Sequence, residues 1–379
     1  MGRQSAVTPL LVLVLGLTPA LAPEPAIAEP ERIETGGPAA EVTLVADGFQ
    51  GPWSLDFLPD GGFLVTEKRG RLWHLDEAGA RQEITGLPEI ADLGQGGLLD
   101  VVVPRDFRES RELLFTHARP LEGGAGTALA AARWPEGSDR LEDLRILFEM
   151  TPGSSAGRHF GSRLVEGPEG HLFFTIGDRG EMQASQDLSR HNGSVIRLNR
   201  DGSVPADNPF VDESDALPEI WSYGHRNPQG AALDLDGRLW LHEHGARGGD
   251  EINRIRKGAN YGWPVISYGR HYSGEPIGEG TSKPGMEQPE FYWDPSIAPS
   301  GLAIYSGELF PEWRGDFLVG SLKFDHIAVI GGDPLSEQGR IEGPQTRRVR
   351  DVTEAPDGTI WFINEPDGAI YRLAPGSDD

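Results

Sequence analysis

The sequence predicts an all-β fold: a six-bladed β-propeller with four-stranded antiparallel blades. Short apolar runs recur on either side of turns that combine Gly with Asp or Glu, which is the signal of a β-hairpin. The 51 Gly and 30 Pro are spread along the 379 residues, as many short strands and loops require. Amphipathic helical periodicity is scarce, so an all-β class is favoured over a mixed one.

The hairpin signals resemble one another along the chain. The first is LDFLPDGGFLVTE at 55–67, matched at 164–178, 231–245 and 352–365 and more weakly at 314–322. Self-similar hairpins at wide spacing indicate a radial array, whereas a β-sandwich, the structural alternative, would not explain the similarity. About 350 residues remain after an N-terminal signal, which divides into six blades of somewhat under 60 residues each.

The N-terminus has the pattern of an export signal. Arg3 provides a positive start, residues 8–18 are apolar, and a small-x-small motif precedes Glu29. We therefore expect residues 1–28 to be a signal peptide, with a retained anchor as the alternative. This predicts a periplasmic or secreted protein with no integral membrane span after processing.

After the signal peptide, we expect a flexible segment at 29–40 and a single propeller domain at 41–375. The chain has no Cys, so packing and metal binding, not disulfides, must hold the exported fold.

The formal net charge of −25 argues against nucleic acid or an anionic membrane surface as a partner. A soluble, self-repelling surface is the simplest interpretation of this acidity. An anionic ligand would need a local basic cluster that acts against the field of the whole molecule.

One candidate catalytic pair is His159 and Asp178. His159 precedes an apolar strand and Asp178 ends its hairpin partner, so the hairpin brings both to one side of a sheet. A His oriented by a carboxylate is suited to act as a general base. The alternative is a structural His beside a turn-forming Asp. Gln95, within three glycines, is a weaker signal for ligand contact, with a hairpin turn as its alternative.

Basic residues form a second candidate site. Arg226 lies in an RNPQG turn, Lys323 ends a short strand, and Arg348 and Arg350 are two residues apart. Two-residue spacing places both arginines on one face of a strand. Carboxylates are the natural match for such guanidinium groups. The alternative is a set of unrelated surface cations, each paired with some of the 59 acidic residues.

A glycine-rich acidic turn at 244–251 is a candidate calcium site. Gly lets the backbone turn carbonyl oxygens inward, and Asp250 and Glu251 add hard oxygen donors. An acidic surface turn is the alternative. His242 and His244 are two residues apart, but no third ligand with suitable spacing supports zinc.

Eight motifs occur in a fixed order: GQGGLLD, GRHFGSRL, TIGDRG, WSYGHRNPQG, EHGARGGDEIN, NYGWP, GSLK and RRVRD. Over residues 40 to 375 the chain resembles the soluble pyrroloquinoline quinone (PQQ)-dependent aldose sugar dehydrogenases, within the soluble quinoprotein glucose/sorbosone dehydrogenase-like family. That resemblance implies the same six-bladed propeller.

The resemblance also implies residue roles. It assigns the general base to His159 and the orienting carboxylate to Asp178. It implies that the quinone is held by Gln95, Arg226, Asn227, Tyr272, Lys323, Arg348 and Arg350. Calcium ligands are implied at Gly245 and Ala246, through their carbonyls on the cofactor-bound ion, and at Glu251 and Tyr261 for a second ion. Ala246 departs from the family, where Pro is common.

The implied activity is oxidation of aldose sugars at C1 to the lactone, with an unidentified electron acceptor, by a monomer or weak dimer. A calcium-dependent propeller lactonase or hydrolase is one alternative, but it has no need of the basic residues. A non-enzymatic binding propeller is another, and the presence of His159 argues against it.

Overall fold

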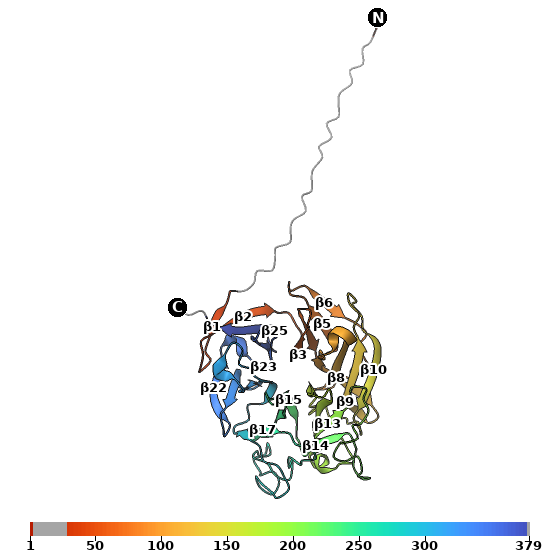
Figure 1. Ribbon diagram of the computed structural model, residues 1–379, viewed down its shortest axis with the longest axis vertical. Helices are drawn as coiled ribbons and strands as arrows, with labels where there is room; N and C mark the ends of the chain where they lie inside the picture. Colours follow the sequence, from red (N-terminus) through yellow and green to blue (C-terminus); the bar gives the residue numbers. More distant parts are fainter. Residues whose placement is uncertain (3–28, 377–379) are drawn as a thin grey trace.

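Six β-sheets are arranged in a ring (Figure 1), in a computed structural model that describes residues 1–2 and 29–376. Five sheets have four strands and one has five, all paired antiparallel, so the predicted six-bladed propeller is confirmed. The signal peptide expected at 1–28 lies outside the described residues except for its first two. No described helix is long and apolar enough to cross a bilayer.

The first strand of each blade lies at the centre of the ring, because these six strands contact one another around it. The first five blades consist of β3 (Pro52–Phe57), β4 (Phe63–Glu67), β5 (Arg71–Leu75) and β6 (Arg81–Ile84); β7 (Leu98–Val102), β8 (Glu112–Leu121), β9 (Gly124–Arg133) and β10 (Glu142–Glu149); β11 (Leu164–Glu166), β12 (Leu172–Ile176), β13 (Ser194–Leu198) and β14 (Ile220–Tyr223); β15 (Pro228–Leu233), β16 (Leu239–Glu243), β17 (Asp250–Arg254) and β18 (Phe291–Trp293); and β19 (Pro299–Ile304), β20 (Phe317–Ser321), β21 (His326–Gly331) and β22 (Ser336–Glu342).

The sixth blade joins the two ends of the described chain. It contains β23 (Val349–Glu354), β24 (Ile360–Asn364), β25 (Ala369–Pro375) and, from the N-terminal side, β2 (Ala40–Ala46), which pairs with β25. A fifth strand, β1 (Glu31–Ile33), pairs with β2, so part of segment 29–40 forms the edge of this blade. Helical structure in the described chain is limited to α1 (Phe107–Ser110), η1 (Met182–Gln186), η2 (Pro311–Trp313) and η3 (Pro344–Thr346).

Each interface between neighbouring blades has its own hydrophobic cluster. Phe115 of the second blade packs in a cluster with Leu64 of the first, and Phe362 of the sixth packs with Leu318 of the fifth. All four side chains are at most 1% exposed. Because burial of one such side chain stabilises the fold by about 1.5–3 kcal/mol, the six clusters together hold the ring closed.

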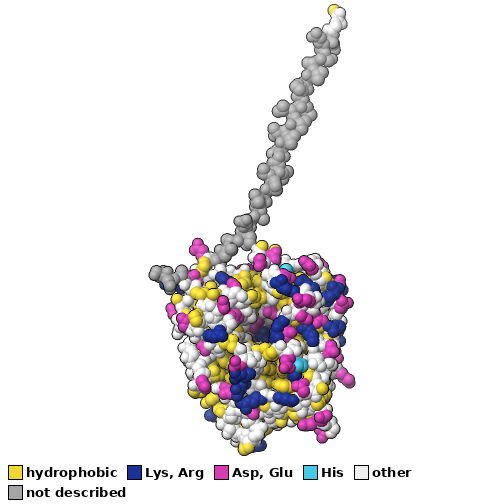
Figure 2. Space-filling model, viewed as in Figure 1, with side chains coloured by type: hydrophobic (Ala, Val, Ile, Leu, Met, Phe, Trp, Pro, Cys, Tyr) yellow, Lys and Arg dark blue, Asp and Glu magenta, His cyan; other side chains and the backbone are white. Residues whose placement is uncertain are grey.

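A charged cluster lies among the inner strands. The guanidinium of Arg163 contacts Asp100 Oδ1 of β7 at 3.1 Å and Asp351 Oδ1 of β23 at 3.0 Å. Burial raises the pKa of Asp351 to about 6, against the effect of Arg163. Burial also raises the pKa of nearby Asp56 in β3 to about 7. Down the ring axis, the space-filling view is hollowed at the centre, with charged side chains around the hollow (Figure 2).

Strand direction decides which loops meet. In every blade, the segment before the first strand and the segment after the second strand emerge on the same side of the ring. We call this side the site face. The hairpin turns between first and second strands emerge on the opposite side.

Candidate active site

His159 and Asp178 meet on the site face. His159 lies in the segment before β11, and Asp178 follows β12, the partner of β11. His159 Nδ1 is 2.6 Å from Asp178 Oδ1, and the imidazole side chain is 12% exposed. The predicted contact is therefore present, and the ring is buried enough to be oriented but still open to a small ligand.

The carboxylate of Asp178 is held from three directions. Besides His159, Gly180 N donates to Oδ1 at 2.6 Å and Trp263 Nε1 donates to Oδ2 at 2.9 Å. Burial works against ionisation, but the hydrogen bond and charge of His159, the Gly180 amide and Arg226 together lower the pKa of Asp178. Asp178 is therefore a carboxylate at neutral pH and accepts the Nδ1 proton of His159.

Burial lowers the pKa of His159. Asp178 opposes this shift, while the positive charges of Arg226 and Arg158 add to it. The imidazole is therefore neutral at physiological pH. With Nδ1 protonated toward Asp178, Nε2 has a free lone pair, which is the state that a general base needs.

The backbone around His159 is constrained. His159 has φ of 55°, in the left-handed region that non-glycine residues seldom adopt. Its N–H donates to Gln95 Oε1 at 2.8 Å. The buried guanidinium of Arg179 donates to Arg158 O and, at 2.6 Å, to Ala156 O. These contacts hold the imidazole in one position, since strained conformations persist only where neighbours fix them.

Arg226 and Asn227 link the third and fourth blades. Arg226 O accepts a hydrogen bond from Asp178 N at 2.8 Å. Asn227 Oδ1 accepts one from Gly161 N at 3.3 Å, so both residues border the His159 segment. The Arg226 side chain donates to His244 O at 3.2 Å and has no carboxylate partner among the described residues.

Arg348 and Arg350 lie together, as their spacing predicts, but they are not unbalanced cations. Arg348 Nε is 3.1 Å from Glu365 Oε2, and Arg350 Nη2 is 2.9 Å from the same oxygen. Arg350 also donates to Gln229 Oε1 at 3.2 Å. The expectation that the cluster needs a ligand anion to balance it is thus too simple here, because Glu365 partly neutralises the pair.

The loop after β16 carries Gly245 and Ala246. Gly245 N donates to Asp250 Oδ1 at 2.8 Å, and a side chain at Gly245 would collide with the backbone of Gly248 and Gly249. The turn is therefore tight, and its shape depends on glycine. Asp250 anchors this turn and does not point outward as a free ligand.

Lys323 reaches the same region from the fifth blade. Its Nζ is 3.2 Å from Ser296 O, and Ser296 Oγ donates to Asp250 Oδ2 at 2.7 Å. Lys323 has no carboxylate partner in the described chain. Lys323, like Arg226, is thus a cation that forms no ion pair with a described carboxylate, and it lies beside the turn of Gly245.

Glu251 faces a second carboxylate. Glu251 and Glu243 are direct cross-strand partners, and Asn253 Nδ2 donates to Glu251 Oε2 at 3.3 Å and to Glu243 Oε1 at 3.2 Å. Burial and the charge of Glu243 raise the pKa of Glu251. Asn253 Oδ1 is buried without a hydrogen-bond partner. Two close carboxylates and an unsatisfied amide oxygen provide suitable donors for a hard cation.

Tyr261 lies near this carboxylate pair. Its ring stacks on His225 at 4.6 Å, and His225 Nδ1 is 2.9 Å from Glu243 Oε1. By contrast, the structure does not bring Tyr272 into contact with the other predicted residues. Tyr272 is 76% exposed and makes no hydrogen bond or ring contact with any described residue. Within the described residues no group of three or more His, Cys, Asp or Glu side chains could hold a metal.

Sequence reasoning missed Trp263, Glu243, Glu365 and Gln229. The hairpin repeats contained a signal for two of them, because Glu243 and Glu365 each stand at or just after the end of the second strand, the place that Asp178 occupies in its own repeat. Acidic residues at this repeat position all reach the site face. Trp263 could not be found in this way, since it comes from the long connection between β17 and β18.

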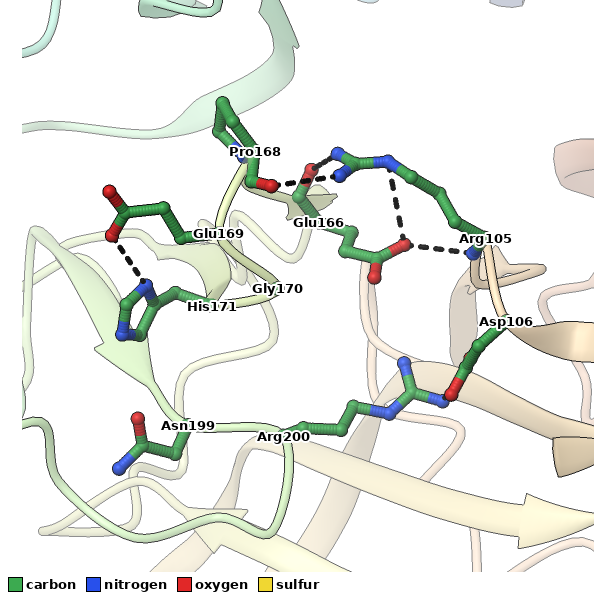
Figure 3. Close-up of a pocket in the computed structure, with 9 residues that line it drawn as sticks. All are labelled: Arg105, Asp106, Glu166, Pro168, Glu169, Gly170, His171, Asn199 and Arg200. Atoms are coloured by element: carbon green, nitrogen blue, oxygen red, sulfur yellow. Dashed lines mark hydrogen bonds and ion pairs between the residues drawn. The ribbon is translucent and has the colours of Figure 1, made fainter.

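A separate cavity of about 510 Å³ opens on the opposite side of the ring, between the second and third blades. It contains none of the predicted residues, and its polar groups largely satisfy one another (Figure 3). Arg105 donates to Glu166 O at 2.7 Å and to Pro168 O at 3.3 Å, and Arg200 is 3.6 Å from Asp106.

His159 is oriented by Asp178 and lies near cations that form no ion pair with a described carboxylate. These cations suit an anionic cofactor, which an oxidoreductase would need and a hydrolase would not. Comparison with known proteins agrees. The family model for Glucose / Sorbosone dehydrogenase matches residues 49–372. The chain therefore belongs to the glucose and sorbosone dehydrogenase family, and it is a sugar dehydrogenase of the PQQ type.

The similar proteins share nearly the whole chain. Aldose sugar dehydrogenase YliI of Escherichia coli K12 is 42% identical over 343 residues, covering 88% of this chain and 92% of that protein. The apo structure of the soluble E. coli aldose sugar dehydrogenase superimposes with a TM-score of 0.86 at 40% identity, covering 89% of this chain and 100% of the other. The PQQ-bound aldose sugar dehydrogenase of Streptomyces coelicolor gives 0.74 at 25% identity, covering 89% and 99%.

The residues present fit an anionic quinone and calcium. Arg226 and Lys323 form no ion pair with a described carboxylate, so they are available to carboxylates of a bound group. The turn has no room for a side chain at Gly245, which suits ligation by its backbone carbonyl. The unsatisfied oxygen of Asn253 beside Glu251 suits a second cation.

Proposed function

We propose that this protein oxidises aldose sugars at C1 to the lactone, using PQQ and calcium, with His159 as the general base. The observation that carries this proposal is the 2.6 Å contact between His159 and Asp178 next to Arg226, a cation without a carboxylate partner. A structural His would not need an open Nε2 on the site face.

His159 accepts the proton that the sugar loses from its anomeric hydroxyl. Nδ1–H donates to Asp178, which fixes the tautomer and stabilises the imidazolium that forms when Nε2 takes this proton. The C1–H bond breaks with its electron pair, so the sugar loses a hydride and one proton, which balances oxidation to the lactone. When bound, the quinone would supply the hydride acceptor and calcium would supply a Lewis acid.

The remaining site residues bind and orient. We assign Gln95, Arg226, Asn227, Tyr272, Lys323, Arg348 and Arg350 to the quinone. We assign Gly245 and Ala246 to its calcium and Glu251 and Tyr261 to a second calcium. Glu243 and Asn253 face the second site, while Trp263 holds Asp178 and lies 5.3 Å from the Arg226 guanidinium, which stacks over its ring.

We also propose a periplasmic or secreted location, on the basis of the charged start, the apolar stretch at 8–18 and the small-x-small motif. Cell fractionation with mass spectrometry of the N-terminus tests this. A mature chain beginning at Glu29 supports the proposal, and an intact N-terminus on a cytoplasmic protein overturns it.

Reconstitution tests the activity. Metal-free protein is incubated with calcium and PQQ, and dye reduction is followed with a panel of aldoses. We expect reduction that needs all three components and cofactor absorbance that stays with the protein on gel filtration. If a broad panel gives no turnover and no absorbance is retained, the proposal is wrong. Lactone hydrolysis without quinone would instead favour a hydrolase.

A further inference from the structure

Two arginines face each other beside the turn that includes Gly245. Arg247 N donates to Arg270 O at 2.9 Å, and Arg270 N donates to Arg247 O at 3.1 Å. This reciprocal pattern is that of an antiparallel hydrogen-bonded pair, so both side chains leave the backbone on the same side, with Cβ atoms about 5.5 Å apart. Both residues are exposed.

Neither guanidinium has a hydrogen-bond or ion-pair partner among the described residues. Arg247 and Arg270 make no side-chain hydrogen bond or ion pair with any residue that the structure describes. Some exposed arginines, such as Arg347, pair with one of the 59 acidic residues, and others, such as Arg140, form no ion pair with a described residue; Arg247 and Arg270 are set apart because they face each other across a backbone bridge. Like charges placed directly opposite destabilise a strand pair, so the pair is explained if it serves a bound anion.

The backbone fixes where this pair stands. A side chain at Gly249 would collide with Gly269, and one at Gly269 would collide with Gly248, so the two segments are in close backbone contact. Arg247 directly follows Ala246 and is three residues from His244, a span of at most about 10 Å for an extended chain. His244 O in turn accepts the Arg226 side chain. The arginine pair thus stands at the rim of the proposed site.

We propose that Arg247 and Arg270 form an oxyanion site for the sugar substrate. They would hold a carboxylate or phosphate carried by an aldose at the end remote from C1, which makes uronic acids and sugar phosphates the favoured substrate class. This inference rests on the proposed function. Two guanidinium groups on one side of a strand pair match the paired oxygens of such an anion.

The quinone does not require this pair. Arg226 and Lys323 form no ion pair with a described carboxylate, so cations for its carboxylates are already present elsewhere.

Binding of two matched sugars tests the site without turnover. Methyl β-D-glucuronide and methyl β-D-glucoside differ only in the carboxylate, and both have a blocked anomeric hydroxyl. Calorimetric titration of the reconstituted protein should show the glucuronide bound at least about tenfold more tightly, as charge-assisted hydrogen bonds predict. The preference should weaken as salt is added.

The double variant Arg247→Gln/Arg270→Gln should bind both sugars alike. The control Arg140→Gln removes an exposed arginine that also lacks an ion pair, on a turn at the opposite side of the ring, and should keep the preference. Methyl glucoside 6-phosphate in place of the glucuronide distinguishes phosphate from carboxylate as the preferred group.

The outcomes separate the two proposals. No preference in the unmodified protein, or a preference that survives in the double variant, overturns the oxyanion site. If the double variant loses affinity for both sugars equally, the arginines support the fold or the cofactor instead, and this result also overturns the oxyanion site. Failure of dye reduction with every aldose, alongside a clear glucuronide preference that the double variant loses, would instead count against the oxidation alone. The single variant Arg270→Gln repeats the test should the double variant fold poorly.

Discussion

At the scale of single residues, the site depends on how His159 is held. Its positive φ, its N–H bond to Gln95 and its imidazole bond to Asp178 fix backbone and ring independently. The sequence predicted the imidazole bond, because strand pairing alone brings the two side chains together. It could not predict the role of Trp263, which reaches Asp178 across 85 residues of chain.

His159→Ala should keep cofactor binding but lose about 10²–10⁴-fold in kcat, since a positioned base contributes that much. Stopped-flow dye reduction and cofactor absorbance measure the two effects separately. Arg140→Ala is the control and should retain wild-type turnover. Near-normal turnover of the His159 variant would remove it from the role of base.

The pH profile should reflect the lowered pKa of His159. Because only the neutral imidazole accepts a proton, kcat/KM should stay level through neutral pH and fall only below the ordinary histidine value. Asp178→Asn removes a group that raises this pKa, so its acid limb should move to still lower pH, with reduced kcat. An acid limb that moves upward would contradict this assignment.

At the scale of strands and turns, the carboxylate pair of β16 and β17 should be destabilising without a cation. Glu243 and Glu251 are directly opposed, and like charges in that position destabilise a sheet. The turn motif at 244–251 includes Glu251, which was therefore predicted as a ligand, whereas Glu243 is the last residue of β16 and lies outside that motif. The register between the strands decides the pairing, and register depends on the three-dimensional fold.

Calcium should raise the melting temperature of the metal-free protein, and Glu251→Gln should abolish most of that increase. Without calcium, the Gln variant should be at least as stable as the wild type, because it removes the repulsion from Glu243. Differential scanning calorimetry with and without calcium measures both effects. Glu312→Gln, at an exposed site, is the control. An unchanged calcium response in Glu251→Gln would place the second ion elsewhere.

At the scale of the whole molecule, the blades meet at a charged centre as well as at apolar interfaces. Arg163 bridges Asp100 of the second blade and Asp351 of the sixth. The hairpin repeats predicted a ring of antiparallel blades, and the chain length together with the family resemblance predicted that there are six. They could not predict this cluster, since its members lie in different repeats and only ring closure brings them together.

Arg163→Leu should destabilise the protein by about 3–5 kcal/mol at neutral pH, because it leaves buried carboxylates unpaired. Arg163 opposes the burial that raises the pKa of Asp351 to about 6, so its removal should raise this pKa further and let the carboxyl group be protonated at higher pH in the folded variant. The deficit should therefore shrink as pH falls from about 8 to about 5. Urea unfolding at both pH values measures this, with Arg372→Leu as the exposed control. A deficit independent of pH would contradict this account.

Ring closure should make β2 indispensable and β1 dispensable. A chain that begins at residue 47 lacks the strand that pairs with β25, which exposes part of two interface clusters, so we expect it not to fold. A chain that begins at residue 39 loses β1 and the bridge between Glu34 and Glu342 but keeps β2, and it should melt within a few degrees of the full protein. Circular dichroism during heating compares the two. Cooperative melting of the shorter chain would show that β2 is not needed.

The pairing of β2 with β25 also sets an order of events during synthesis. β2 is among the first strands to leave the ribosome, and its partner is the last. Until β25 emerges, β2 has an open edge that could pair with other chains. Five blades can form before the sixth, but the charged centre cannot assemble until the ring closes. A nascent chain that stalls a few residues before Pro375 would therefore be prone to aggregation, whereas the completed chain has joined its first strand to its last.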